Sequence, residues 1–157
     1  MNAPINMATL VGELASRPRG RACIVLTRDF AGQKAWAAAL ARRTGAAHLD
    51  VLERFAEDAS LAEQLSRFTP AALFDFLKEA TDKSVLIVSG LEFLKASWSG
   101  QSQALEEFAA KVELWAEKNA PALLFVMQQD AYIAGRPFTR FRQHTFVVEQ
   151  EETLALE

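Results

Sequence analysis

Cysteine, histidine and long apolar runs are scarce in this chain of 157 residues. Cys23 is the single cysteine, which excludes an intrachain disulfide. The two histidines, His48 and His144, lie far apart, so the sequence offers no metal-ligand spacing. The longest apolar runs, such as "ACIVL" and "ALLFVM", are much shorter than the roughly 20 residues that span a bilayer, and the first segment lacks the basic start and apolar core of a signal peptide. We therefore expect a cytoplasmic protein that contacts no membrane and holds no metal.

Charge is low overall but unevenly distributed along the chain. The formal net charge is −3, yet the segment 17–43 contains seven basic residues and one acidic residue, Asp29. The basic residues are Arg17, Arg19, Arg21, Arg28, Lys34, Arg42 and Arg43. Such a segment predicts an electropositive surface for an anion, a nucleic acid or an acidic partner, and a solvated basic edge is the simpler alternative.

Strand-like and helix-like segments alternate along the chain. Short apolar runs bounded by turn residues predict strands over 21–27, 46–51, 84–90, 122–128 and 144–149. Helical periodicity covers 7–14, 33–44, 70–80 and 101–119. Continuous apolar strands are typical of a parallel sheet that is covered on both faces. The sequence therefore predicts a single domain over residues 1–157, with a three-layer α/β fold and a mostly parallel, five-stranded sheet flanked by helices.

One strand, loop and helix bear directly on function. The segment 27–45, "TRDFAGQKAWAAALARRTG", follows the apolar run "ACIVL". In P-loop NTPases a strand leads into a glycine-rich loop whose amides cradle phosphates, and Lys and Ser or Thr then begin a helix. Aligned on Lys34, this loop has Arg28 at the first glycine position, Gln33 at the second and Ala35 at the hydroxyl position. Lys34 alone is kept of the four signature residues.

The order of elements resembles the AAA+-like branch of the P-loop NTPases, in which an additional strand lies between the first and the third. The third strand of those proteins ends in two acidic residues that hold magnesium and activate water, and Ser89 and Gly90 stand there in this chain. Glu92 has the wrong spacing for either role. The chain length and the run "GLEFL" are also similar to the small P-loop component of the BREX phage-exclusion systems. These resemblances imply a degenerate P-loop domain, with antiviral defence as its setting.

Binding of a nucleotide without hydrolysis requires fewer groups than hydrolysis does. The resemblance and the helix N-terminus suggest a set of residues for such binding. They are Lys34, Arg28, Gly32 and, as a sensor at the end of the fourth strand, Gln128. Two residues argue against it, because the Cβ of Gln33 would crowd a loop that wraps phosphate and Asp29 adds a negative charge. We therefore predict no cofactor, with weakly bound ATP and magnesium as the alternative.

Two other segments are predicted to contact partners. Trp98 lies in "ASWSGQSQ", whose small residues are typical of a loop and favour an exposed anchor at least as much as a core position. In "GRPFTRFR", Arg136, Arg140 and Arg142 lie where a sensor or finger arginine is expected, and a solvated basic loop is the alternative. The interleaved phenylalanines of this segment suit single-stranded nucleic acid.

Three functions are compatible with these observations. We favour a non-catalytic pseudo-NTPase domain that acts as a protein-interaction or scaffold subunit, with other subunits or a second copy as partner. The first alternative is a weak ATP-binding subunit whose site is completed by a partner. The second is a local nucleic-acid-binding module, against which the acidic charge of the whole chain argues.

Overall fold

A computed structural model describes residues 4–98, 103–117 and 119–156 of the chain. The strands are β1 (Ala22–Thr27), β2 (Ala47–Asp50), β3 (Val85–Ser89), β4 (Ala122–Gln128) and β5 (Val147–Glu149). The α-helices are α1 (Met7–Ser16), α2 (Gln33–Thr44), α3 (Val51–Glu57), α4 (Ala59–Ala62), α5 (Pro70–Leu77), α6 (Glu92–Ser97), α7 (Ala104–Leu114) and α8 (Ala131–Gly135). Two 3-10 helices are η1 (Leu65–Arg67) and η2 (Gln150–Glu152). Within the described ranges, no helix has the length and apolar character that crossing a bilayer requires.

The strands form one sheet in the order β2-β3-β4-β1-β5, and every pairing is parallel. The expectation of a mostly parallel, five-stranded sheet is confirmed. β4 lies between β1 and β3, with Thr27 opposite Gln128, and Asp50 of β2 lies opposite Ser89 of β3. Because the strands run in one direction, their last residues meet along one side of the sheet, called the carboxyl edge below.

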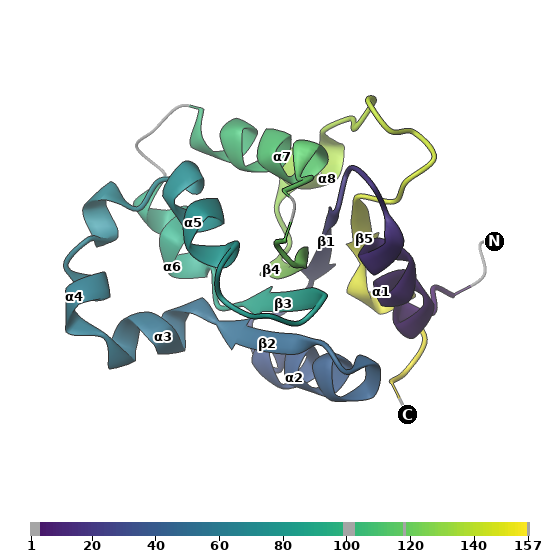
Figure 1. Cartoon of the computed structure of the whole chain (residues 1–157), viewed down its shortest axis with the longest axis horizontal. Helices are drawn as coiled ribbons and strands as arrows, with labels where there is room; N and C mark the ends of the chain where they lie inside the picture. Colours follow the sequence, from purple (N-terminus) through teal and green to yellow (C-terminus); the bar gives the residue numbers. More distant parts are fainter. Residues whose placement is uncertain (1–3, 99–102, 118, 157) are drawn as a thin grey trace.

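Helices cover both faces of the sheet, which makes three layers. Figure 1 shows α5, α6 and α7 on one side of the strands and α1 and α2 on the other. A hydrophobic core lies on each face of the sheet, and successive residues of β1 point alternately into the two cores. Ile24 and Leu26 belong to the core under α5 and α7, whereas Cys23 and Val25 belong to the core under α1 and α2. Continuous apolar strands are needed because both faces of each central strand are buried.

Local signals in the sequence fix several helix ends. Thr69 caps α5 by accepting a hydrogen bond from the Ala72 N–H through Oγ1 at 3.2 Å, and Pro70 begins the helix. Gly45 ends α2 in the left-handed region, at φ 77°. The predicted ends of α2 therefore agree with the structure.

The structure corrects the predictions for α7 and Trp98. α7 ends at Leu114, whereas the sequence predicts a helix over 101–119; residues 101, 102 and 118 lie outside the described part. Trp98 is only 3% exposed, and its indole Nε1 donates a hydrogen bond to the Phe68 carbonyl at 2.9 Å. The prediction that Trp98 is an exposed anchor is wrong, because α6 directs this side chain into the core despite the small residues that follow it.

Candidate functional site

Polar residues gather at the carboxyl edge, where the loop between β1 and α2 also lies. Gln33, the first residue of α2, is 2% exposed and points toward the ends of β1 and β3. Its Nε2 donates to Thr27 Oγ1 at 3.5 Å, and its Oε1 accepts from the Gly90 N–H at 3.2 Å. Both ends of the amide have partners, so Gln33 links β1 to β3 and occupies the space between them.

A second cluster joins the ends of β2 and β3. Ser89 Oγ donates to Asp50 Oδ2 at 2.9 Å and lies 2.8 Å from His48 Nε2. Because the Ser89 hydroxyl donates its hydrogen bond to Asp50, its oxygen is the acceptor toward His48. His48 Nε2 therefore carries a proton and donates it in a hydrogen bond to Ser89. Burial lowers the pKa of His48, which favours the neutral ring. Ser89 is fully buried and bonded to a carboxylate, so this arrangement differs from that of an activated nucleophile.

The loop between β1 and α2 borders a shallow hollow of about 370 Å³. Arg28, Gly32 and Gln33 line it, together with Gln150 of η2. The Arg28 guanidinium already has a carboxylate partner, because its Nε lies 2.9 Å from Glu151 Oε2. Of the four residues predicted to bind a nucleotide, only Arg28 and Gly32 line this hollow.

Lys34 and Gln128 lie elsewhere at this edge. The Lys34 ammonium forms an ion pair with Glu53 of α3, and this hydrogen bond raises the pKa of the lysine. Both side chains of the pair are about half exposed. The Gln128 N–H donates to Glu92 Oε2 at 2.7 Å, so Glu92 does reach the end of β4. The anion-binding roles of Lys34 and Gln128 stay predictions.

Arg136 joins α8 to α7 through ion pairs. Its Nε and Nη2 contact the two carboxylate oxygens of Glu106 at 2.9 and 3.0 Å, and its Nη1 lies 3.3 Å from Glu113 Oε1. The guanidinium carbon also lies 4.8 Å from the centre of the Phe138 ring. Only 14% of the Arg136 side chain is exposed, whereas Arg140 and Arg142 are exposed. Arg136 therefore connects α7 to the end of α8 within the protein. Of the three arginines, Arg140 and Arg142 are the two that a partner could contact.

The Glu106–Arg136 pair makes stability depend on pH. Hydrogen bonds from Arg136 and Tyr132 lower the pKa of Glu106 from its ordinary 4.5 to about 2. A carboxyl whose pKa is lowered by folding stabilises the fold fully above pH 4.5, and this contribution is lost as pH falls toward 2. We expect urea midpoints of wild type and Glu106→Gln to differ near neutral pH and to converge in acid, whereas Glu63→Gln, at an exposed position, should match wild type throughout. Equal midpoints of wild type and Glu106→Gln at neutral pH would contradict this.

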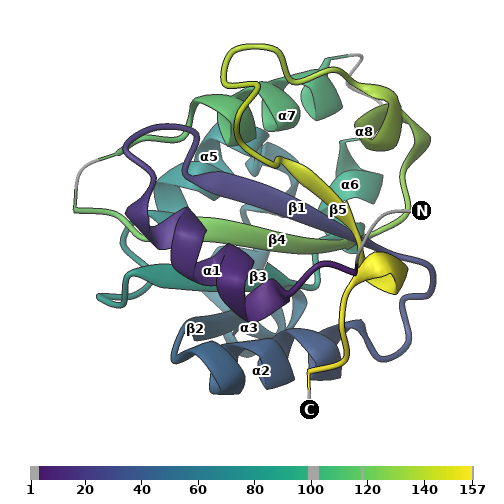
Figure 2. The same ribbon diagram turned by 90° about the vertical axis from the view of Figure 1, so that its right-hand side faces the viewer.

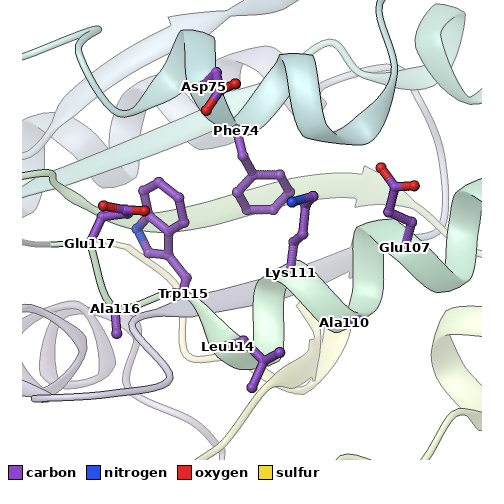
Figure 3. Close-up of a pocket in the computed structure, with 9 residues that line it drawn as sticks. All are labelled: Phe74, Asp75, Glu107, Ala110, Lys111, Leu114, Trp115, Ala116 and Glu117. Atoms are coloured by element: carbon purple, nitrogen blue, oxygen red, sulfur yellow. The ribbon is translucent and has the colours of Figure 1, made fainter.

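A larger hollow, of about 760 Å³, lies between α5 and α7. Figure 3 shows its aromatic floor, formed by Phe74 and Trp115, with Leu114 beside it. Leu114 is an apolar residue that is 50% exposed. Three carboxylates and one ammonium surround this floor (Figure 3). They belong to Asp75, Glu107, Glu117 and Lys111. We call this surface the α5–α7 groove.

Sequence reasoning missed the residues that dominate the carboxyl edge. The sequence indicates Gln33 only as a residue whose Cβ crowds the loop, and it predicts no role for Asp50. The available signal was Gly32, directly before the helix, because a glycine at that position marks the turn into α2 and makes Gln33 its first residue. The Asp50–Ser89 contact had no signal in the sequence, since 39 positions separate the two residues.

Comparisons with known proteins give no match. No protein-family model matches the chain, and no curated protein and no solved structure matches it.

Proposed function

We propose that the chain is a degenerate P-loop-like domain without catalytic activity, which serves as a protein-interaction subunit of a larger complex. The strand order supports this, because β4 lies between β1 and β3 as in the AAA+-like branch that the sequence resembles. The position of the β1–α2 loop at the carboxyl edge supports it as well. An antiviral setting rests on the resemblance to the BREX component.

Gln33 is the observation that carries the proposal. A shift of one residue from the alignment on Lys34 puts Gly32 at the glycine before the signature lysine, Gln33 at the lysine and Thr27 at the first glycine. The residue at the lysine position is then a neutral amide, already bonded to Thr27 and Gly90. It neutralises no phosphate charge, and phosphoryl transfer depends on charge neutralisation and positioning.

The α5–α7 groove supports the second half of the proposal. It is an apolar floor within a rim that holds three carboxylates and one ammonium among its described residues. The net negative charge of this rim suits a protein segment that presents an apolar side chain flanked by Lys or Arg. Tryptophan is a residue type that anchors such contacts when a partner excludes water, and the half-exposed Leu114 adds apolar surface beside Trp115.

We expect calorimetric titration with ATP or ADP, with and without magnesium, to show no saturable heat. Lys34→Ala should give the same result, because the Lys34 ammonium is paired with Glu53 outside the loop. Saturable binding that Lys34→Ala abolishes would contradict the proposal and favour the weak ATP-binding subunit.

Light scattering then distinguishes a second copy from another protein as the partner. A mass that rises with concentration in wild type, and falls to the monomer in Leu114→Asp, identifies the groove as a contact between copies. Leu52→Asp is the matched control, because Leu52 is 43% exposed and lies on α3, outside the groove. A monomeric wild type excludes a contact between copies, which leaves another subunit as the proposed partner of the groove.

A further inference from the structure

Two basic segments that are far apart in the sequence lie together at the amino ends of β1 and β5. β1 and β5 are parallel, with Ile24 opposite Val147, so the loops that precede them reach the same end of the sheet. Figure 2 shows the chain before β1 and the long loop before β5 at that end, opposite the turn into α2. The carboxyl edge and its β1–α2 loop are therefore on the other side of the molecule.

Direct contacts join the two loops. Gly20 is buried, and a Cβ built on it would lie 2.9 Å from Phe146 Cζ and 3.2 Å from Phe141 Cδ2. The Arg17 guanidinium carbon lies 5.8 Å from the centre of the Phe146 ring. Burial lowers the pKa of His144, and the nearby Arg17 charge lowers it further. Loop 17–21 and loop 138–144 thus form one continuous surface, called the basic surface below.

Exposed cations are concentrated on this surface. Arg19 comes from the first loop, and Arg140 and Arg142 come from the second; all three are exposed. Two carboxylates in the described part of the chain bond to these loops, and both already have partners. Glu13 pairs with Arg17 at 3.0 Å, and Glu113 accepts the Arg140 N–H at 2.9 Å as well as pairing with Arg136.

Aromatic residues alternate with the arginines along the second loop. Phe141 and His144 are partly exposed, and their ring centres are 6.2 Å apart. Phe138 stacks on Phe146 at 5.2 Å, which fixes the base of the loop. Arginines that contact phosphates, beside rings on which bases stack, are the features that bind single strands without sequence preference. An acidic peptide would use the arginines but would gain nothing from the rings.

We propose that the basic surface, formed by residues 17–21 and 138–144, binds single-stranded nucleic acid. Three phosphate contacts, one for each exposed arginine, give a slope of log affinity against log salt of about −2. Between about 50 mM and about 200 mM salt, the affinity should then fall about 20-fold. This proposal is independent of the pseudo-NTPase proposal, because it involves neither the β1–α2 loop nor the α5–α7 groove.

Fluorescence anisotropy of the full chain with a labelled oligothymidylate tests this. We expect Arg140→Glu/Arg142→Glu to weaken binding at least about tenfold and to reduce the salt slope by about 1.4, the share of two contacts. Arg67→Glu is the control, because Arg67 is an exposed arginine of η1, outside the basic surface. Circular dichroism verifies that each variant is folded. An oligouridylate arm distinguishes RNA from DNA within the same class.

Several results would overturn the proposal. They are absence of wild-type binding at low salt, affinity that does not respond to salt, a double variant that binds like wild type, and an equal loss in Arg67→Glu. Tighter binding of duplex DNA than of the single strand would also overturn it, since duplex bases are not free to stack. Displacement of the strand by an equal concentration of a glutamate-rich peptide would assign the surface to an acidic protein partner instead.

Discussion

Gly90→Ala is expected to lower the free energy of unfolding by about 3 kcal/mol, as left-handed strain and a steric clash act together. Gly90 has φ 74°, a region that residues with a side chain rarely adopt. An added Cβ would lie 2.5 Å from Oδ1 of Asp50, a carboxylate that is held in place by hydrogen bonds from Ser89 to Oδ2 and from the Glu53 N–H to Oδ1. Urea unfolding followed by tryptophan fluorescence measures the change.

Gly32→Ala separates the two contributions. Gly32 has φ 82°, but an added Cβ would have no atom within 4 Å. This variant carries the backbone strain alone, so we expect a loss of about 1 kcal/mol. The combination Gly90→Ala/Asp50→Ala should cost less than the sum of its single changes, because the clashing carboxylate is gone. Equal effects at Gly32 and Gly90 would show that the contact with Asp50 contributes nothing.

The second large effect is expected for Arg136→Met, at about 3 kcal/mol of lost stability. The Glu113 side chain is 6% exposed and would keep a buried charge, with the Arg140 N–H as its one remaining partner among the described residues. The ion pair between Arg136 and Glu106 and the contact with the Phe138 ring would be lost as well. Thermal and urea unfolding measure the loss.

A companion substitution tests whether the buried charge is the cause. Glu113→Gln in the Arg136→Met background removes the charge, so the double variant should be more stable than Arg136→Met alone. Arg142→Met should stay within about 0.5 kcal/mol of wild type, because Arg142 is exposed. A double variant less stable than Arg136→Met would indicate that packing, rather than charge, explains the effect.

The fold was more predictable than the candidate site. Runs such as "SVLIVSG" specify buried strands by composition, and the cap of α5 at Thr69 and the end of α2 at Gly45 are local signals. The site depends instead on which side chain turns inward at one helix end. The alignment on Lys34 predicts that the charged residue is the functional one. In the structure its ammonium contacts Glu53, and the amide of the neighbouring Gln33 lies between the ends of β1 and β3.

The exposure of individual side chains was equally hard to predict from the sequence. Trp98 has small neighbours in the sequence, yet α6 turns its indole into the core. There the indole N–H donates a hydrogen bond to the Phe68 carbonyl. Arg136, Arg140 and Arg142 look alike in the sequence, yet among the described residues only the guanidinium of Arg136 forms ion pairs with Glu106 and Glu113. Exposure depends on which side chains of other elements lie nearby, and that information is distributed along the whole chain.

The sequence by itself determined the alternation of strands and helices, the burial of both sheet faces and the mismatch between segment 27–35 and the P-loop signature, because each depends on residues that are neighbours in the chain. Only the tertiary structure decided the strand order, the Gln33 bridge between β1 and β3, and the Asp50–Ser89 contact. It also brought Arg19 beside the loop that carries Arg140 and Arg142. These features join residues that are distant in sequence, and the parallel pairing of all five strands places them together.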